Sequence, residues 1–457
     1  MPRAKKSRDS SRLASGVSAI HAPFYSFRHD PGSRTAAPLQ LSCEGVALER
    51  IAKSAKTPTY VYSQASIESA YRILDRSLSS LPHTLCYAVK ANSNLSVLRV
   101  FGRLGSSFDI VSGGELDRLG RIGVSGDRVV FSGAGKSREE IREALRFPGR
   151  DSRSKGILLF NVESESEFEI LLSEAGKILS KGGSPASASI RVNPDVLAGG
   201  HPHISTGHHR HKFGMTWADA RRLYLAHQNS RSISWRGISA HIGSQILSVA
   251  PYRRAVARLA SYYRDLTRQG IALRFLDIGG GFGIRYTKEA PLDAARLART
   301  LAPIVRPLRC RLLLEPGRFL VGPAGVLLTR VLFVKKTGGK TFVIVDAAMN
   351  DLIRPVLYGA VHPIAAVRQT LGSPASPAIV DVVGPVCETG DFLARGISLP
   401  PVNPGDLLVV TAAGAYGFAQ SSNYNSRPRA AEVLVHGNRF RIVRRRETRA
   451  DIVRAEL

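Results

Sequence analysis

From residue 84 to residue 317 the chain alternates short apolar runs with amphipathic stretches. The apolar runs are 84–90, 106–112, 128–133, 157–162, 188–193, 237–243, 274–281 and 311–317. The stretches between them, such as 137–147 and 251–269, place apolar residues at the spacing of one helix face. Eight strand–helix units across roughly 230 residues predict a (β/α)₈ barrel, also called a TIM barrel, in an α/β fold class.

The pattern changes after residue 316. Short alternating segments separated by turn residues follow at 324–336, 340–348, 378–386, 406–416 and 431–447. They predict a C-terminal all-β domain, Greek-key or sandwich-like, over 317–457. The apolar pieces 39–48 and 57–63 precede the barrel without a helix partner of their own, so we expect residues 36–63 to contribute strands to the β domain and residues 64–316 to form the barrel.

Composition and charge are those of a globular enzyme. The chain has 457 residues, of which 44% are hydrophobic and 22% charged, and a formal net charge of +28. The basic residues run through the whole chain without a nucleic-acid-binding signature, so we expect solvated surface and no nucleic-acid partner. Residues 1–35 are basic and Ser-rich with no apolar core, which excludes a secretory signal; we predict a disordered tail, with a transit peptide as the alternative.

The cysteines and the hydropathy restrict the compartment. Cys43, Cys86, Cys310 and Cys387 show no C-x-x-C spacing, which argues against a zinc site or a disulfide framework and suits a reducing compartment such as the cytoplasm. No window approaches the roughly 18 uninterrupted apolar residues of a membrane span, so we expect no membrane association.

Polar residues gather where the predicted barrel strands end, which is where barrel enzymes carry their chemistry. They are Lys90, Asp109, Ser112, Ser132, Asn161, Arg191, Asn193, His241, Ser244, Gly279, Gly280, Gly281, Glu315 and Arg318. Ordinary loops would supply one or two such residues by chance. A lysine, a histidine, a glutamate and three consecutive glycines together favour an active site.

The glycine run 279–281 predicts an anion cradle at the end of the seventh strand, although a glycine triplet alone is a weak indication. It is neither a Walker loop nor a Rossmann fingerprint. With a strand-end lysine and carboxylate it fits pyridoxal phosphate: Lys90 would bond the cofactor aldehyde, Glu315 would hold the ring nitrogen and His241 would stack on the ring. Taken alone, His241 could equally be a hydrogen-bonded core histidine.

The segment 201–215 contains five histidines. It has no acidic or cysteine ligands beside them, and their spacing matches no standard zinc pattern. We therefore predict no metal site and interpret this segment as a loop over the active site.

Several long stretches resemble a known family. They are "YAVKANSN", "FDIVSGGEL", "HPHISTGHHRHKFGM", "HIGSQI", "DIGGGFGI", "EPGRFLVGPAGVLLTRV", "DAAMNDLIRPVLYGAVH", "VVGPVCETGDFL" and "AAGAYGFAQSSNYNSRPRAAEVLV". Together they cover nearly everything from residue 40 to residue 447. The chain resembles the diaminopimelate decarboxylase family, fold-type III pyridoxal-phosphate enzymes related to alanine racemase and the eukaryotic-type ornithine decarboxylases.

The resemblance implies a role for each matching position. The cofactor contacts it implies are Lys90 as the covalent attachment, His241 on the ring, Glu315 at the ring nitrogen, Ser244 and Gly279 to Gly281 at the phosphate, and Asp109, Gly317, Arg318 and Tyr416. The substrate contacts it implies are Arg318, Arg354, Tyr358, Glu388 and Tyr416. Cys387 corresponds to the acid that reprotonates the carbanion. In the family Cys387 and Glu388 reach the neighbouring subunit's cofactor, which implies an obligate homodimer.

The implied reaction is decarboxylation of meso-diaminopimelate to L-lysine and carbon dioxide, the last step of lysine biosynthesis. Relatives acting on ornithine, arginine or carboxynorspermidine are the nearest alternative, but they need no grip on a second carboxylate, so Arg318, Arg354 and Tyr358 favour a dicarboxylic substrate. A racemase is disfavoured by Glu315, where that branch carries an arginine. A silent cofactor carrier would need no β domain with "CETGD" and "GAYG".

Overall fold

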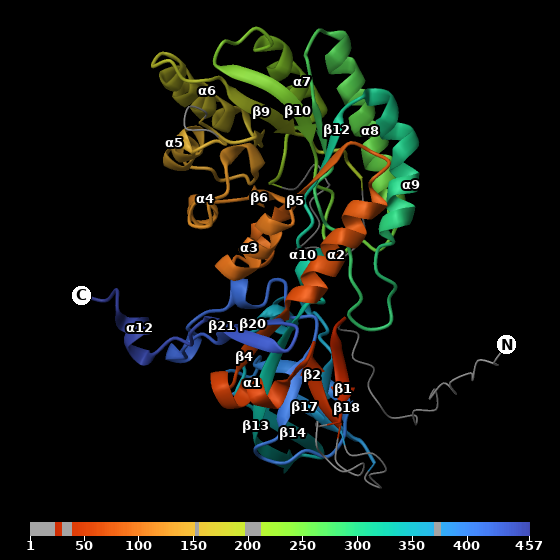
Figure 1. Ribbon diagram of the computed structural model, residues 1–457, viewed down its shortest axis with the longest axis vertical. Helices are drawn as coiled ribbons and strands as arrows, with labels where there is room; N and C mark the ends of the chain where they lie inside the picture. The colour runs from red at the N-terminus through yellow and green to blue at the C-terminus, as the bar shows by residue number, and fades with distance from the viewer. Residues whose placement is uncertain (1–22, 30–38, 151–154, 197–211, 370–375) are drawn as a thin grey trace, which may run out of the picture.

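Eight parallel strands close into a barrel, which confirms the prediction from the alternating pattern. The computed structural model describes residues 23–29, 39–150, 155–196, 212–369 and 376–457. The barrel strands pair in chain order, and the last returns to the first: β5 (His83–Ala88), β6 (Ser107–Ile110), β7 (Val129–Phe131), β8 (Leu159–Val162), β9 (Ala186–Arg191), β10 (Ile233–Ser239), β11 (Phe275–Asp277) and β12 (Arg311–Leu314). Figure 1 shows the barrel at one end of the long axis and the second domain at the other.

Helices surround the barrel. They are α2 (Gln64–Ser77), α3 (Leu95–Arg103), α4 (Gly113–Gly120), α5 (Arg138–Arg146), α6 (Glu165–Leu179), α7 (Trp217–Ala226), α8 (Val249–Arg268) and α9 (Ala294–Val305). The helices expected at 137–147 and 251–269 are confirmed as α5 and α8. Serine begins five of the eight, and at α5 Ser137 and Glu140 form a reciprocal capping box. Such caps stabilise a helix start by about 1 kcal/mol.

The strand period separates the apolar interior of the barrel from its polar end. Cys86, Val130, Leu159 and Leu313 form one buried layer contributed by four strands. Side chains two residues apart on a strand share a face. Two residues after Val130, Leu159 and Leu313, the same strand faces carry Ser132, Asn161 and Glu315. All three of these polar side chains are buried. These polar residues therefore lie at the carboxyl ends of the strands, directly next to an apolar layer of the barrel interior.

The second domain is built on a nine-stranded mixed sheet, with a smaller four-stranded sheet beside it, which confirms a separate β domain. Its strands are β1 (Tyr25–Arg28), β2 (Leu39–Cys43), β3 (Val46–Ala47), β4 (Thr59–Ser63), β13 (Gly325–Thr337), β14 (Lys340–Val345), β15 (Ile364–Ala366), β16 (Arg368–Gln369), β17 (Ala378–Val383), β18 (Phe392–Leu399), β19 (Leu407–Val410), β20 (Ala431–His436) and β21 (Arg439–Arg444). Its helices are α1 (Leu48–Ala55), α10 (Arg318–Val321), α11 (Arg354–Tyr358) and α12 (Arg449–Val453).

Chain segments on both sides of the barrel share the larger sheet. The strand β4 precedes the barrel, yet it pairs antiparallel with β13 and parallel with β20. The order is β18-β17-β14-β13-β4-β20-β21, so β4 occupies the middle of the sheet. Its five residues are all buried, as expected for a central strand covered on both faces.

The prediction of a disordered tail over residues 1–35 is wrong for residues 25–28. These form β1, which pairs antiparallel with β2. Tyr25 is buried, and its hydroxyl donates to the carbonyls of Val61 at 2.8 Å and Ala324 at 3.1 Å. This strand was not predicted because it is only four residues long, and its alternation of aromatic and polar residues is too short to be distinguished within a basic segment. Residues 1–22 and 30–35 lie outside the described residues.

Two further findings concern membrane spans and the cysteines. Within the described part of the chain, no helix combines the length and apolar character needed to cross a membrane. All four cysteines are free; Cys43, Cys86 and Cys310 are buried, and Cys387 is exposed.

Candidate active site

Lys90 and Asp109 form an ion pair at the end of the first two barrel strands. Lys90 lies in the short 3₁₀ turn 89–91 that follows β5, and its Nζ is 2.6 Å from Oδ2 of the fully buried Asp109 in β6. The other carboxylate oxygen of Asp109 has no partner among the described residues. Burial lowers the pKa of Lys90, but the negative charges of Asp109 and then Glu315 outweigh burial and raise this pKa above its ordinary value. Lys90 is therefore an ammonium here.

Glu315 follows β12 and joins a polar network across the barrel mouth. Its Oε1 accepts from the hydroxyl of Ser132 at 3.2 Å and from the amide of Asn161 at 3.4 Å. The same amide nitrogen lies 3.0 Å from Oδ2 of Asp277, at the end of β11. Ser189 donates to the amide oxygen of Asn161. The network thus connects Glu315 to residues in or directly after four other strands, β7, β8, β9 and β11.

Asp277 and Glu315 are both buried at the barrel mouth, and each of these carboxyl groups affects the pKa of the other. Burial raises the pKa of Asp277 to about 6. Burial, followed by the charges of Asp109 and Asp277, raises the pKa of Glu315 well above its usual range. Asp277 was not among the residues expected in the site, because it lies within the apolar strand pattern "RFLDI". Its only signal was a carboxylate separated by one residue, Ile278, from three glycines.

The glycine run 279–281 makes a turn that only glycine fits. Gly279 and Gly281 have φ of 67° and 84°, and a side chain at Gly280 would lie 2.1 Å from the carbonyl oxygen of Glu315. The N–H of Gly279 already donates to Asp277 and that of Gly280 to His241. Of the three N–H groups in this run, only that of Gly281 lacks an acceptor within the described residues, so the cradle is narrower than the sequence suggests.

His241 follows β10 and is held by this turn. Its Nδ1 accepts from the N–H of Gly280 at 3.1 Å, which requires that nitrogen to be unprotonated. Burial, then the charges of Arg191 and Lys90, lowers the pKa of His241 well below its ordinary value. The ring is therefore a neutral imidazole at the barrel mouth.

Two buried arginines converge on one tyrosine. Arg318 in α10 donates to the hydroxyl of Tyr286 at 2.6 Å and to that of Ser244 at 3.1 Å. Arg354 in α11 donates to the same Tyr286 hydroxyl at 3.4 Å and to Nε2 of His362 at 3.3 Å. Tyr286 and His362 were not among the residues expected from the sequence. Tyr286 lies in the loop after the seventh barrel strand, whereas Arg354 belongs to the β domain.

Aromatic rings complete the surroundings of the arginines. The guanidinium carbon of Arg318 lies 4.9 Å from the ring centre of Tyr416, and that of Arg354 lies 5.5 Å from the ring centre of Tyr358. The backbone N–H of Tyr416 donates to the carbonyl of Ala91 at 2.8 Å, which joins the β domain to the Lys90 turn. A side chain at Gly317 would come within 3.0 Å of Cβ of Ala91.

Cys387 and Glu388 stand apart from this group. Both are exposed, and within the described residues no hydrogen bond or ion pair joins them to a barrel side chain. The N–H of Cys387 donates to Asn425, and the Glu388 carboxylate accepts from the hydroxyl of Tyr424 at 2.9 Å.

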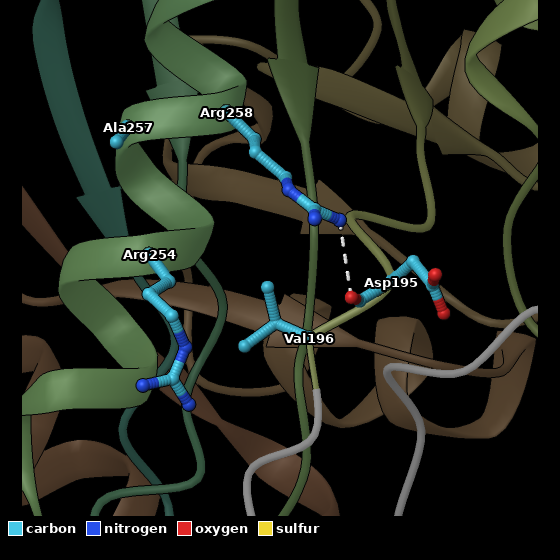
Figure 2. Close-up of a pocket in the computed structure, with 5 residues that line it drawn as sticks. All are labelled: Asp195, Val196, Arg254, Ala257 and Arg258. Atoms are coloured by element: carbon cyan, nitrogen blue, oxygen red, sulfur yellow. Dashed lines mark hydrogen bonds between the residues drawn. The ribbon is translucent and has the colours of Figure 1, made fainter.

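The described part of the chain contains no group of three or more potential ligands that could hold a metal ion. The predicted histidine-rich loop falls mainly on residues 197–211, outside the described residues. A cavity of about 480 Å³ lies between α8 and the segment after β9. Figure 2 shows the residues that line it, which are Asp195, Val196, Arg254, Ala257 and Arg258. Arg258 donates to the carbonyl of Asp195 there. None of the expected site residues lines it.

The group at the barrel mouth fits pyridoxal phosphate. An amine at Lys90 suits the aldehyde, and the carboxyl of Glu315 suits the ring nitrogen. Three polar groups lack a protein partner among the described residues: Oδ1 of Asp109, the N–H of Gly281 and Nε of the buried Arg318. Buried polar groups are normally satisfied, so this set is suited to a polar ligand with an anionic end.

Comparisons with known proteins agree with this geometry. Residues 64–322 match the family model described as pyridoxal-dependent decarboxylase, pyridoxal binding domain. The diaminopimelate decarboxylase of Pseudomonas fluorescens is 48% identical over 91% of this chain and 97% of its own length, and that of Aquifex aeolicus is 43% identical over 92% and 96%. The crystal structure of the Helicobacter pylori diaminopimelate decarboxylase with L-lysine covers 90% of this chain and 99% of its own, with a TM-score of 0.83 at 38% identity. This chain belongs to the diaminopimelate decarboxylase family.

Proposed function

We propose that this chain uses pyridoxal phosphate to decarboxylate meso-diaminopimelate, giving L-lysine and carbon dioxide. Its membership of the family, the fit of the barrel mouth to the cofactor and the buried arginines all support this. The choice of substrate rests on one observation, the positive charge of the two buried arginines Arg318 and Arg354.

Arg318 and Arg354 are 6% and 5% exposed, and their side-chain hydrogen bonds go to neutral groups within the described residues. Two buried cations without an anion are costly, since each has lost water and gained no opposite charge. An anionic ligand removes this cost. A guanidinium matches a carboxylate or phosphate with two parallel hydrogen bonds. A substrate carboxylate held by Arg318 and Arg354, with a phosphate near Ser244 and Arg318, would satisfy both.

The residues of the barrel mouth divide the cofactor between them. Lys90 would bond its aldehyde, Glu315 would hold its ring nitrogen, and the N–H of Gly281 with Ser244 and Arg318 would take its phosphate. His241, neutral and fixed by Gly280, would lie against the ring. When bound, pyridoxal phosphate supplies the electron sink for the pair of electrons left behind by carbon dioxide.

The remaining side chains would determine the orientation of the substrate and therefore which of its two ends reacts. Arg354 with Tyr358 would hold the carboxylate that stays, and Tyr416 would contact both cofactor and substrate. Glu388 would bind the distant ammonium and Cys387 would return a proton to the reacting carbon. The exposure of Cys387 and Glu388, away from the barrel of their own chain, supports a homodimer in which each subunit completes its partner's site. The cytoplasm, where lysine synthesis and reduced thiols coincide, is the compartment we propose.

The test is a direct assay. Purified protein with pyridoxal phosphate should release lysine and carbon dioxide in equal amounts from meso-diaminopimelate. Ornithine and arginine, which have one carboxylate each, should be poor substrates. Turnover of ornithine or arginine with no lysine formed from meso-diaminopimelate would refute the proposed substrate. Replacing Arg354 by Gln should raise KM for meso-diaminopimelate by about tenfold or more, as expected for a lost charge-assisted contact.

A further inference from the structure

The hydroxyl of Tyr286 lies between the guanidinium groups of Arg318 and Arg354. It accepts from Arg318 at 2.6 Å and from Arg354 at 3.4 Å. A guanidinium has five N–H donors and no acceptor, so in both contacts the phenol oxygen is the acceptor. The hydroxyl proton of Tyr286 takes part in neither contact. Among the described residues no acceptor lies within reach of it.

His362 holds the guanidinium of Arg354 in place beside Tyr286. Nδ1 of His362 lies 3.0 Å from the carbonyl of Thr411, so it carries the ring proton and leaves Nε2 free to accept from Nε of Arg354. Burial, then the charge of Arg354, lowers the pKa of His362 to about 3, which keeps the ring neutral. The ring also packs edge-on against Tyr286, with centroids 5.2 Å apart.

The same cluster contains a second donor without a partner. Nε of Arg318 is buried and makes no hydrogen bond within the described residues. The cluster therefore presents an unused phenol proton and an unused guanidinium N–H beside two uncompensated positive charges. Satisfying both requires an acceptor with negative charge and more than one lone pair, which describes a carboxylate.

We propose that Tyr286 is a substrate-binding residue: its hydroxyl donates to the substrate carboxylate that Arg318 and Arg354 hold, and its position between them sets their spacing. The identity of that substrate rests on the proposed function. The phenol joins a barrel loop to the β domain, so one side chain makes the carboxylate site depend on both domains. Loss of the hydroxyl removes one donor to the carboxylate and the one acceptor that, within the described residues, the two arginines share.

The variant Tyr286→Phe tests this, with Tyr263→Phe as the matched control. Tyr263 is also buried, and its hydroxyl donates to the carbonyl of Leu273 at 2.7 Å, away from the arginines. In the cofactor-loaded enzyme, Tyr286→Phe should raise KM for meso-diaminopimelate about tenfold and leave kcat within about twofold of wild type. Tyr263→Phe should change neither. An unchanged KM for Tyr286→Phe would overturn the proposal, as would an equal effect of both variants.

Equilibrium binding of pimelate, the seven-carbon dicarboxylate without amino groups, separates this proposal from the reaction. Calorimetry should show affinity reduced about tenfold in Tyr286→Phe relative to wild type. If wild type binds pimelate in this Tyr286-dependent way yet forms no lysine, the proposed function fails and the carboxylate site stands. If wild type forms lysine and Tyr286→Phe binds pimelate normally, only the present inference fails.

A second variant covers the case in which Tyr286→Phe does not fold. His362→Phe keeps an aromatic ring against Tyr286 and removes the acceptor for Nε of Arg354. It should raise KM for meso-diaminopimelate and weaken pimelate binding in the same direction, because the guanidinium is no longer held. Wild-type values for both quantities in this variant would contradict the arrangement.

Discussion

The ammonium of Lys90 lies 2.6 Å from the carboxylate of Asp109, and this short contact holds the lysine in its charged form. An ammonium cannot attack an aldehyde, because its nitrogen has no free electron pair. Asp109 therefore opposes the first step of cofactor attachment in the free protein while it positions the amine that performs it.

Replacing Asp109 by Asn should shift covalent cofactor attachment to lower pH. The pKa of Lys90 is raised above its ordinary value by the charge of Asp109 and then that of Glu315, despite burial, so removing one of these charges lowers it. The pH midpoint of the attachment rate should fall by about one unit or more. Stopped-flow absorbance over a pH series gives the midpoint. A variant midpoint equal to or above that of wild type would contradict this role of Asp109.

Replacing Lys90 by Ala should abolish covalent attachment. After borohydride reduction, mass spectrometry should find the cofactor on the peptide containing Lys90 in wild type and on no peptide of the variant. Lys136, which is buried and paired with Glu167, provides the control. Cofactor found on Lys136 in wild type would show that Lys90 is not the attachment residue.

The Asp277 and Glu315 pair should make the cofactor-free protein less stable as the pH rises. Burial raises the pKa of Asp277 to about 6 in the folded state, whereas an unfolded aspartate has a pKa of about 3.9. The folded state therefore binds more protons in this interval. The contribution of this group to stability is full below the unfolded pKa and is lost as the pH rises through the folded one.

The variant Asp277→Asn should remove that loss. Between about pH 4 and pH 6 the unfolding free energy of wild type should fall relative to that of the variant, as measured by the denaturant midpoint of the cofactor-free proteins. Asp75→Asn serves as a control, since Asp75 is half exposed on α2. Parallel pH profiles for wild type and Asp277→Asn would show that Asp277 is ionised throughout this range.

Mixing inactive subunits tests the shared site. Cys387→Ala should slow turnover and leave cofactor binding unchanged, because the thiol is exposed and makes no described contact with the barrel groups. If each site combines Lys90 of one subunit with Cys387 of the other, refolding Lys90→Ala together with Cys387→Ala should restore about a quarter of wild-type activity, since half the dimers are mixed and each has one intact site. No recovery on mixing would place both residues in one subunit's site.

The barrel could be predicted because its signal is local and repeated. Each strand is a short apolar run followed by a polar residue, and the two-residue period that buries Cys86, Val130, Leu159 and Leu313 also presents Ser132, Asn161 and Glu315 to the opening. The β domain was harder. The strand β18 contains Arg395 and Gly396 in its middle, the latter with φ of 61°, so its alternation is interrupted and it was not expected. The strands β15 and β16 are too short to show any period.

The sequence by itself determined which residue types stand at the strand ends, and therefore that an amine, an imidazole, a carboxylate and a glycine turn share one opening. Only the tertiary structure decided how they engage one another. The Asn161 amide reaches Asp277 across 116 residues, and the phenol of Tyr286 reaches Arg354 across 68. Such contacts leave no local pattern in the sequence. Their atoms are brought together by barrel closure and by the docking of the β domain, and not by a fixed spacing along the chain.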